Sequence, residues 1–180
     1  MDKRVQFTKI RDVKSPNRAN MHDAGIDFFI PNYTEEFAQV LKHKNAKNKI
    51  QYHLAFDEDC GTYMEITLGA HEQICIPSGI KVNIMDKNTY LDANNKSGVA
   101  TKYSLIVGAK VIDADYQGEV HINLINTSNK PVTIRTGQKI VQFIHKEYIP
   151  SDFIEIANEE YDSISKTDRG EGGFASTGEQ

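Results

Sequence analysis

The stretch QICIPSGIKVNI at residues 73–84 carries the pattern that decides the fold of this chain. Apolar and polar side chains alternate on both sides of Pro-Ser-Gly, which we interpret as a turn between two strands that bury one face of a sheet. The same alternation returns in EVHINLIN at 119–126 and in PVTIRTGQKIVQFI at 131–144, where Thr-Gly interrupts it. Strand-length runs separated by turn residues predict an all-β domain built as a sandwich, jelly roll or barrel.

One segment departs from this period of two. TEEFAQVLKHK at 34–44 offers Thr34 as a helix N-cap, with two glutamates in the first turn and lysines near the end. Three apolar residues share one face of the expected helix: Phe37, Val40 and Leu41. IQYHLAF at 50–56 and TYMEITL at 62–68 flank the turn DEDCG. In the first of these two runs, alternate positions are apolar: Ile50, Tyr52, Leu54 and Phe56. This part of the chain therefore predicts a short helix followed by a β-hairpin.

The composition bounds the class of protein. The 180 residues are 39% apolar and 26% charged, as in an ordinary globule, so we expect a single domain over 1–180. The net charge of −4 disfavours a polyanion partner, and any phosphate must be held locally by a few cations, backbone amides or a metal. We therefore expect no nucleic-acid partner and interpret the lysine-rich stretch 42–49 as a solvated loop.

Nothing in the sequence indicates a membrane or a secretory route. No apolar run approaches the length of a membrane span, and the start MDKRVQF lacks the hydrophobic core of a secretory signal. The spacing of Cys60 and Cys75 matches no metal or redox motif. We expect a cytoplasmic protein with reduced thiols and no membrane partner, located in the host cytoplasm if a virus encodes it.

The segment HDAGIDFF at 22–29 is the first candidate for chemistry. Asp23 and Asp27 are four residues apart, so in an extended segment both carboxylates point the same way. Paired acids on one face can orient water or help to hold Mg²⁺. The alternative is an ordinary turn, because Asp-Ala-Gly is favourable turn chemistry.

The segment NNKSGVATK at 94–102 is the second candidate. Lys96, Ser97 and Gly98 offer an ammonium group, a hydroxyl and an unobstructed backbone amide in succession. Such a series can form a small nest for phosphate oxygens. The alternative is again an ordinary turn.

The segment GAKVIDADYQGEV at 108–120 predicts a hairpin whose tip carries an acid and a ring. Asp113 and Asp115 flank one alanine, Tyr116 follows at once, and Gly118 closes the turn. A carboxylate kept ionised and aimed by its surroundings, such as Asp113, could take a proton from water. The alternative is a structural hairpin with incidental acids.

Two further segments lie near the end of the chain. In TGQKIVQFIH at 136–145, alternation would place four residues on one side of a strand: Gln138, Ile140, Gln142 and Ile144. DRGEGGFASTG at 168–178 carries an arginine, a phenylalanine, two hydroxyls and several glycines after the last apolar run. We interpret the polar stretch from about 158 to 180 as a mobile arm.

Taken together and in this order, the five segments closely resemble the five motifs of the trimeric dUTPase family. The resemblance covers roughly 5–30 and 64–178, so we interpret 31–63 as an insertion between the first and second motifs. It implies a distorted jelly-roll subunit of the β-clip type that forms a homotrimer. It also implies cleavage of dUTP to dUMP and pyrophosphate with Mg²⁺.

The resemblance implies a role for each matching residue. Asp113 would activate the water that attacks the α-phosphorus, a reaction that asks mainly for positioning and charge neutralisation. Asp27 would support the site and, through water, an Mg²⁺ ion held mainly by the triphosphate. The phosphates would be bound by four residues: Lys96, Ser97, Gly98 and Gln142.

Base and sugar selection would come from the third motif. The backbone of four residues would face the uracil edge: Lys110, Val111, Ile112 and Asp113. Tyr116 would lie against the sugar and leave no space for a 2′-hydroxyl, so UTP would be rejected. In the C-terminal arm, Arg169 would reach the γ-phosphate and Phe174 would cover the uracil, with Ala175 beside it. Ser176 and Thr177 would add hydroxyl donors.

Three positions depart from the family pattern. Lys96 stands where arginine is usual and lacks the bidentate fork. Lys110 stands where glycine is frequent, which would cost energy if that backbone needs a positive φ. Ala175 replaces a glycine and would restrict the arm. Two alternative functions remain: a dCTP deaminase-like enzyme, or a non-catalytic nucleotide-binding regulator that uses 31–63 as a partner surface.

Overall fold

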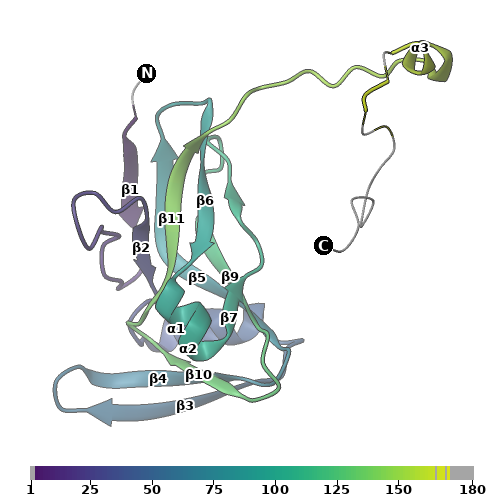
Figure 1. The fold of residues 1–180 in the computed structure, drawn as a ribbon. Coiled ribbons are helices and arrows are strands. Elements are labelled where there is room, and N and C mark those ends of the chain that lie inside the picture. Colours follow the sequence, from purple (N-terminus) through teal and green to yellow (C-terminus); the bar gives the residue numbers. More distant parts are fainter. Residues whose placement is uncertain (1–2, 165, 169, 171–180) are drawn as a thin grey trace. The chain divides into compact units, whose positions relative to one another are not determined.

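The computed structural model describes residues 3–164, 166–168 and 170 (Figure 1). The chain divides into two compact units, Met1–Ile149 and Pro150–Gln180. The described part of the second contains one short helix, α3 (Asn158–Asp162), and its described residues from 151 onward are exposed. Among the described residues, no helix combines the length and apolarity needed to cross a membrane.

The first unit is built from three antiparallel sheets, which confirms the all-β prediction. One sheet has the order β1 (Val5–Lys9), β5 (Gln73–Ile84), β9 (Glu119–Asn126), β7 (Leu105–Val107). A second has the order β2 (Ile26–Phe29), β11 (Lys139–Glu147), β6 (Thr89–Asn95), β8 (Val111–Ile112). The third has the order β10 (Val132–Arg135), β4 (Gly61–Leu68), β3 (Ile50–Asp57). In Figure 1, β3, β4 and β10 run crosswise at one end of the other two sheets.

The period of two places the core as expected. Along β9, Val120, Ile122 and Leu124 are buried, while the residues between them are partly exposed. These side chains join a single hydrophobic cluster drawn from all three sheets. The arrangement is of the jelly-roll type. In such a fold, the alternate side chains of each strand that face inward fill the space between the sheets.

Pro-Ser-Gly is not the turn that we predicted. β5 runs through it as one strand, with a shift in its pairing with β9 between Pro77 and Lys81. Gly79 has a φ of +73°, and a Cβ there would lie 3.0 Å from the Cβ of Arg11. The feature is a β-bulge, which keeps the strand continuous and explains why glycine is needed.

The Thr-Gly interruption is a turn, and it moves the chain between sheets. Gly137 has a φ of +77°; β10 before it pairs with β4, whereas β11 after it pairs with β2 and β6. A second irregularity, between Lys139 and Val141, reverses the expected alternation of β11. Ile140 is therefore buried like Val141 and does not share the face of Gln142, contrary to our prediction.

The predicted helix and hairpin are both present. α1 (Glu35–Lys44) begins after Thr34, whose hydroxyl oxygen accepts a hydrogen bond from the Phe37 N–H at 3.1 Å. Phe37 and Leu41 are fully buried, so the apolar face of α1 belongs to the main core. The hairpin β3–β4 pairs along its whole length, but Leu54 and Phe56 in its outer half are exposed.

Candidate functional site

Asp27 on β2 is the centre of a charged cluster. Asp27 is only 3% exposed, and each of its two carboxylate oxygens accepts a hydrogen bond from a different lysine. The Lys96 ammonium lies 2.5 Å from Oδ1, and the Lys139 ammonium lies 2.7 Å from Oδ2. Burial acts to raise the pKa of Asp27, but the hydrogen bonds from Lys139 and Lys96 outweigh it and bring that pKa below its ordinary value of 3.8.

Asp23 does not join this cluster. Its Oδ2 accepts a hydrogen bond from the Asn20 N–H at 2.9 Å, as in a turn. The paired-acid interpretation is therefore wrong, and the turn interpretation is correct. The chain between Asp23 and Asp27 is not extended throughout, so spacing by four does not bring the two carboxylates onto one face.

Gln142 joins the fourth motif to the first and second. It lies opposite Asp27 in the pairing of β11 with β2, and its Nε2 donates to the Asn95 carbonyl at 2.8 Å. A Cβ on Gly25 would lie 2.1 Å from the Gln142 Oε1, so glycine permits this close approach. The structure thus brings together Asp27, Lys96 and Gln142, as the resemblance implies.

The Lys-Ser-Gly string is the beginning of a helix. α2 (Ser97–Tyr103) starts at Ser97, with Lys96 as its N-cap residue, and the Val99 and Ala100 N–H groups donate to the Lys96 carbonyl. Ser97 and Gly98 are exposed, and a Cβ on Gly98 would meet nothing within 4 Å. The first turn of α2 is therefore accessible beside the Asp27 cluster.

Lys139 is a residue of this cluster that our sequence analysis missed. It lies three positions before Gln142, at the start of β11, and it binds the Asp27 carboxylate oxygen that Lys96 does not bind. The only local signal was a cation within the fourth motif. Its proximity to Asp27 depends on the pairing of β11 with β2, which residue spacing alone does not give.

Asp113 lies on a longer and less regular loop than a hairpin tip. β7 and β9 pair, but between them β8 leaves to pair with β6 in another sheet. Asp113 follows β8 directly, is exposed, and accepts a hydrogen bond on its carbonyl from the Tyr116 N–H. It lines a pocket of about 740 Å³ together with Asp115 and Tyr148.

Tyr116 is held at the hydroxyl end of its ring. Its hydroxyl donates to the Glu119 carbonyl at 2.9 Å. A Cβ on Gly118 would lie 2.3 Å from the Tyr116 Oη, so the ring lies directly against that glycine. The ring is nevertheless 41% exposed and available for contact.

Lys110 does not carry the backbone strain that we considered. Among the described residues, the non-glycine positions with positive φ are His71 and Ser104. The Lys110 ammonium lies 3.4 Å from a carboxylate oxygen of Asp92, and the Lys110 carbonyl accepts from the Ala93 N–H. The lysine therefore fastens β8 to β6.

Within one copy of the chain, the two parts of the candidate site remain separate. The pocket at Asp113 includes none of the residues of the Asp27 cluster, and among the described residues no hydrogen bond or ion pair between side chains joins the two. The predicted arm residues lie outside the described residues: Arg169, Phe174, Ala175, Ser176 and Thr177.

The Asp27 cluster has a testable electrostatic signature. Because the folded-state pKa of Asp27 is lowered, its ion pairs stabilise the fold above about pH 4 and lose this contribution as the pH falls further. We expect Asp27→Asn to lower the free energy of unfolding by about 1–3 kcal/mol at pH 7. Urea unfolding at one protein concentration would measure this difference, which should shrink toward pH 3. An equal difference at both pH values would contradict it.

Comparison with known proteins agrees with the motifs. The dUTPase family model matches residues 41–178. The deoxyuridine 5′-triphosphate nucleotidohydrolase of Candida albicans is 42% identical over 112 residues, which are 62% of this chain and 68% of that protein. The Arabidopsis thaliana enzyme of the same name is 34% identical over 120 residues, 67% and 69% of the two chains. The chain belongs to the dUTPase family. The match begins inside the segment that we interpreted as an insertion.

Solved structures support the same fold. The dUTPase of Staphylococcus bacteriophage 80alpha with dUpNHpp has a TM-score of 0.69 at 19% identity, covering 97% of this chain and 98% of that one. The EIAV dUTPase has a TM-score of 0.58 at 17% identity, covering 86% and 98%. At these identities the likeness concerns the fold.

Proposed function

We propose that this protein hydrolyses dUTP to dUMP and pyrophosphate, with Asp113 activating the attacking water at the α-phosphorus. The observation that carries the proposal is the assembly of the first, second and fourth motifs around Asp27, in a chain of the dUTPase family. Asp113 is exposed on a loop anchored at both ends, which suits a base that must reach a bound water.

The triphosphate would bind beside α2. Lys96 would supply a cation. Ser97 and Gly98 are exposed and would supply a hydroxyl and an accessible backbone, and Gln142 lies next to them. Asp27 holds Lys96 in place and neutralises part of its charge. Lys96 therefore acts as an oriented point charge, without the fork that an arginine would provide.

The base would bind along β8. This strand lies at the edge of its sheet, with its inner side paired to β6 and its outer backbone groups unused by the sheet. Val111 and Ile112 can therefore offer backbone donors and acceptors to the uracil edge. A cytosine would leave such groups mismatched, at a cost of about 1–3 kcal/mol for each unsatisfied buried group. Tyr116 would exclude a ribose.

A homotrimer would complete the site. In one copy the Asp113 pocket and the Asp27 cluster share no residue, so we propose that a second copy supplies the missing part. The arm would then close over the nucleotide, with Arg169 at the γ-phosphate and Phe174 over the uracil. Ala175, Ser176 and Thr177 would line the closed arm. An arm of this kind suits closure because its glycines allow it to order only when loaded.

Magnesium fits this site as an ion that arrives with the nucleotide. Among the described residues there is no group of three or more His, Cys, Asp or Glu side chains that could hold a metal. Both oxygens of Asp27 already accept from lysines, so this residue would reach an ion through water. When bound to the phosphate oxygens, Mg²⁺ would neutralise charge that develops on the leaving pyrophosphate.

A substrate assay tests the proposal directly. The protein would be incubated with dUTP, dCTP and UTP in the presence of Mg²⁺, while pyrophosphate and ammonia are followed. We expect pyrophosphate from dUTP alone. Ammonia from dCTP without pyrophosphate from dUTP would favour the deaminase alternative, and binding of dUTP without any product would favour a regulator.

A second role, in binding a protein partner, is favoured by one observation. Leu54 and Phe56 are exposed in the outer half of the β3–β4 hairpin, and Phe56 is 73% exposed. On α1, by contrast, Phe37 and Leu41 are buried and Val40 is only partly exposed. We therefore propose that a partner of the segment 31–63 would contact the hairpin, and that Leu54→Ser with Phe56→Ser would abolish its binding while dUTP hydrolysis continues.

A further inference from the structure

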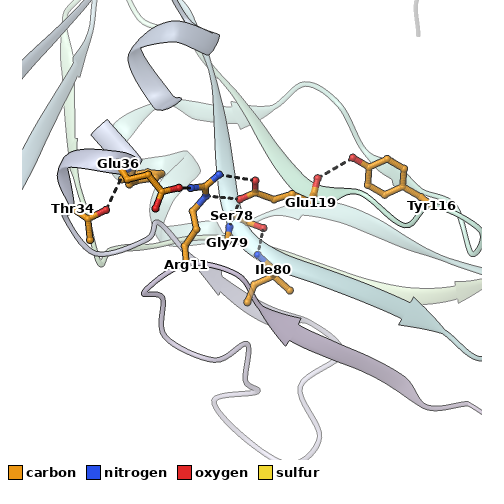
Figure 2. Close-up of polar contacts among 9 residues, drawn as sticks. Arg11, Thr34, Glu36, Ser78, Gly79, Ile80, Tyr116 and Glu119 are labelled. Carbon is orange, nitrogen blue, oxygen red and sulfur yellow. Dashed lines mark hydrogen bonds and ion pairs between the residues drawn. The ribbon is translucent and has the colours of Figure 1, made fainter. Parts of the chain in front are cut away.

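A partly buried ion-pair network connects the first unit's N-terminal segment to the loop that carries Tyr116 (Figure 2). Arg11 donates from Nε to the Glu119 Oε1 at 3.0 Å and from Nη2 to Oε2 at 3.1 Å. Its remaining nitrogen, Nη1, donates to Glu36 on α1 at 2.7 Å. The pair is bidentate, which fixes the direction of both side chains.

The Glu119 carboxylate is also fastened to the bulge of β5. Its Oε1 accepts the Gly79 N–H at 2.7 Å, a donor that the bulge turns away from the strand ladder. The side chains of Arg11 and Glu119 are each only 12% exposed, and the hydrogen bond that Arg11 donates to Glu119 raises the pKa of Arg11. A carboxylate so enclosed would be left largely unpaired if Arg11 were removed.

Glu119 connects this network to the ring predicted to lie against the sugar. Its backbone carbonyl accepts the hydrogen bond from the Tyr116 hydroxyl, and Figure 2 shows Arg11, Glu119 and Tyr116 in succession. Glu119 therefore has its side chain anchored by Arg11 and its carbonyl anchoring Tyr116. Any displacement of Glu119 at the start of β9 moves the group that holds the Tyr116 hydroxyl.

We propose that Arg11 and Glu119 are positioning residues for Tyr116 and thereby set the discrimination between deoxyribose and ribose. The inference rests on the proposed function, in which Tyr116 occupies the space of a 2′-hydroxyl. Arg11 and Glu119 touch no substrate; they hold the ring at the height that excludes the hydroxyl. Glu36, whose side chain is exposed, adds a lesser contact from α1.

The test compares hydrolysis of dUTP and UTP by the full chain. For Arg11→Met we expect the ratio of kcat/KM for dUTP over UTP to fall about tenfold, a coupling typical of residues in one contact network. The kcat for dUTP should change much less, because the proposed general base Asp113 and the Asp27 cluster are unaltered in this variant. Both substrates are measured on one preparation, so any unfolded fraction cancels in the ratio.

Three further variants make the test specific. Tyr116→Phe removes the hydroxyl and retains the ring, so it should lower the same ratio. Arg11→Met added to Tyr116→Phe should lower it no further, because the contact through which Arg11 acts is already absent. The matched control is Glu147→Gln, which removes the acid of an exposed ion pair with Lys3 and should leave the ratio unchanged.

The outcomes separate the inference from the function on which it rests. If the unaltered protein does not hydrolyse dUTP, the proposed function fails. If it hydrolyses dUTP selectively and Arg11→Met keeps the ratio, the positioning role is wrong while the function stands. Additive losses in the double variant would also overturn it, by showing that Arg11 does not act through Tyr116. Should Arg11→Met fold poorly, Arg11→Lys, which keeps the charge and loses the fork, should still lower the ratio in part.

Discussion

Asp113→Asn is expected to lower kcat for dUTP by about 10²–10⁴-fold, the contribution of a positioned general base. The substitution keeps the size of the side chain and removes its ability to accept a proton. Asp113 is exposed, so the fold should tolerate the change. Steady-state pyrophosphate release would measure the loss, and calorimetric titration with a non-hydrolysable dUTP analogue should give an affinity close to that of the unaltered protein.

Asp115→Asn is the matched control for this experiment. Asp115 is two residues away, is exposed, and lines the same pocket as Asp113. If the effect arose from the charge of the loop alone, both variants would lose turnover equally. Near-normal turnover in Asp113→Asn would place the base elsewhere in the molecule.

Truncation after Asp168 is expected to reduce kcat/KM for dUTP by about 10²-fold or more. The deleted segment contains Arg169 and Phe174, which we predict to bind the γ-phosphate and to stack on the uracil, and each such contact typically contributes a tenfold factor or more. The described residues 151–164 are all exposed, so removal of the chain beyond them should leave the melting temperature unchanged. Pyrophosphate release and a thermal melt would measure the two effects.

A shorter truncation provides the comparison. Removal of Glu179 and Gln180 alone leaves the fifth motif intact and should preserve turnover. A melting temperature lowered by several degrees in the longer truncation would contradict the prediction, because it would make the arm part of the folded structure. Full activity without residues 169–180 would show that the site closes in another way.

The segment 31–63 illustrates how far pattern and packing agree. The sequence correctly predicts α1 from its N-cap, its charges and the spacing of Phe37 and Leu41. It does not reveal that this face packs into the main core, because the same spacing would serve a projecting helix. The burial means that deletion of 34–62 would remove core side chains, and we expect it to destabilise the fold.

Residue spacing predicts the structure correctly where the residues that interact are close in sequence. The alternation of β9 and the cap of α1 depend on backbone geometry over a few residues, so both follow from local pattern. It fails at the bulge of β5, which the sequence pattern does not distinguish from a turn, and at that of β11, where one extra residue reverses the alternation. A glycine in a strand-like run signals either a turn or a bulge, and Gly79 shows that the surrounding sheet decides between them.

By itself, the sequence determined the strand-rich class of the chain, its helix and hairpin, and the order of five motifs that place it among dUTPases. Only the tertiary structure decided that Lys139 completes the Asp27 cluster, that β8 joins β6, and that Arg11 reaches Glu119 across 108 positions of the chain. The reason is physical: periodicity expresses the geometry of adjacent residues. A contact between distant side chains depends instead on which strands pair and in which register.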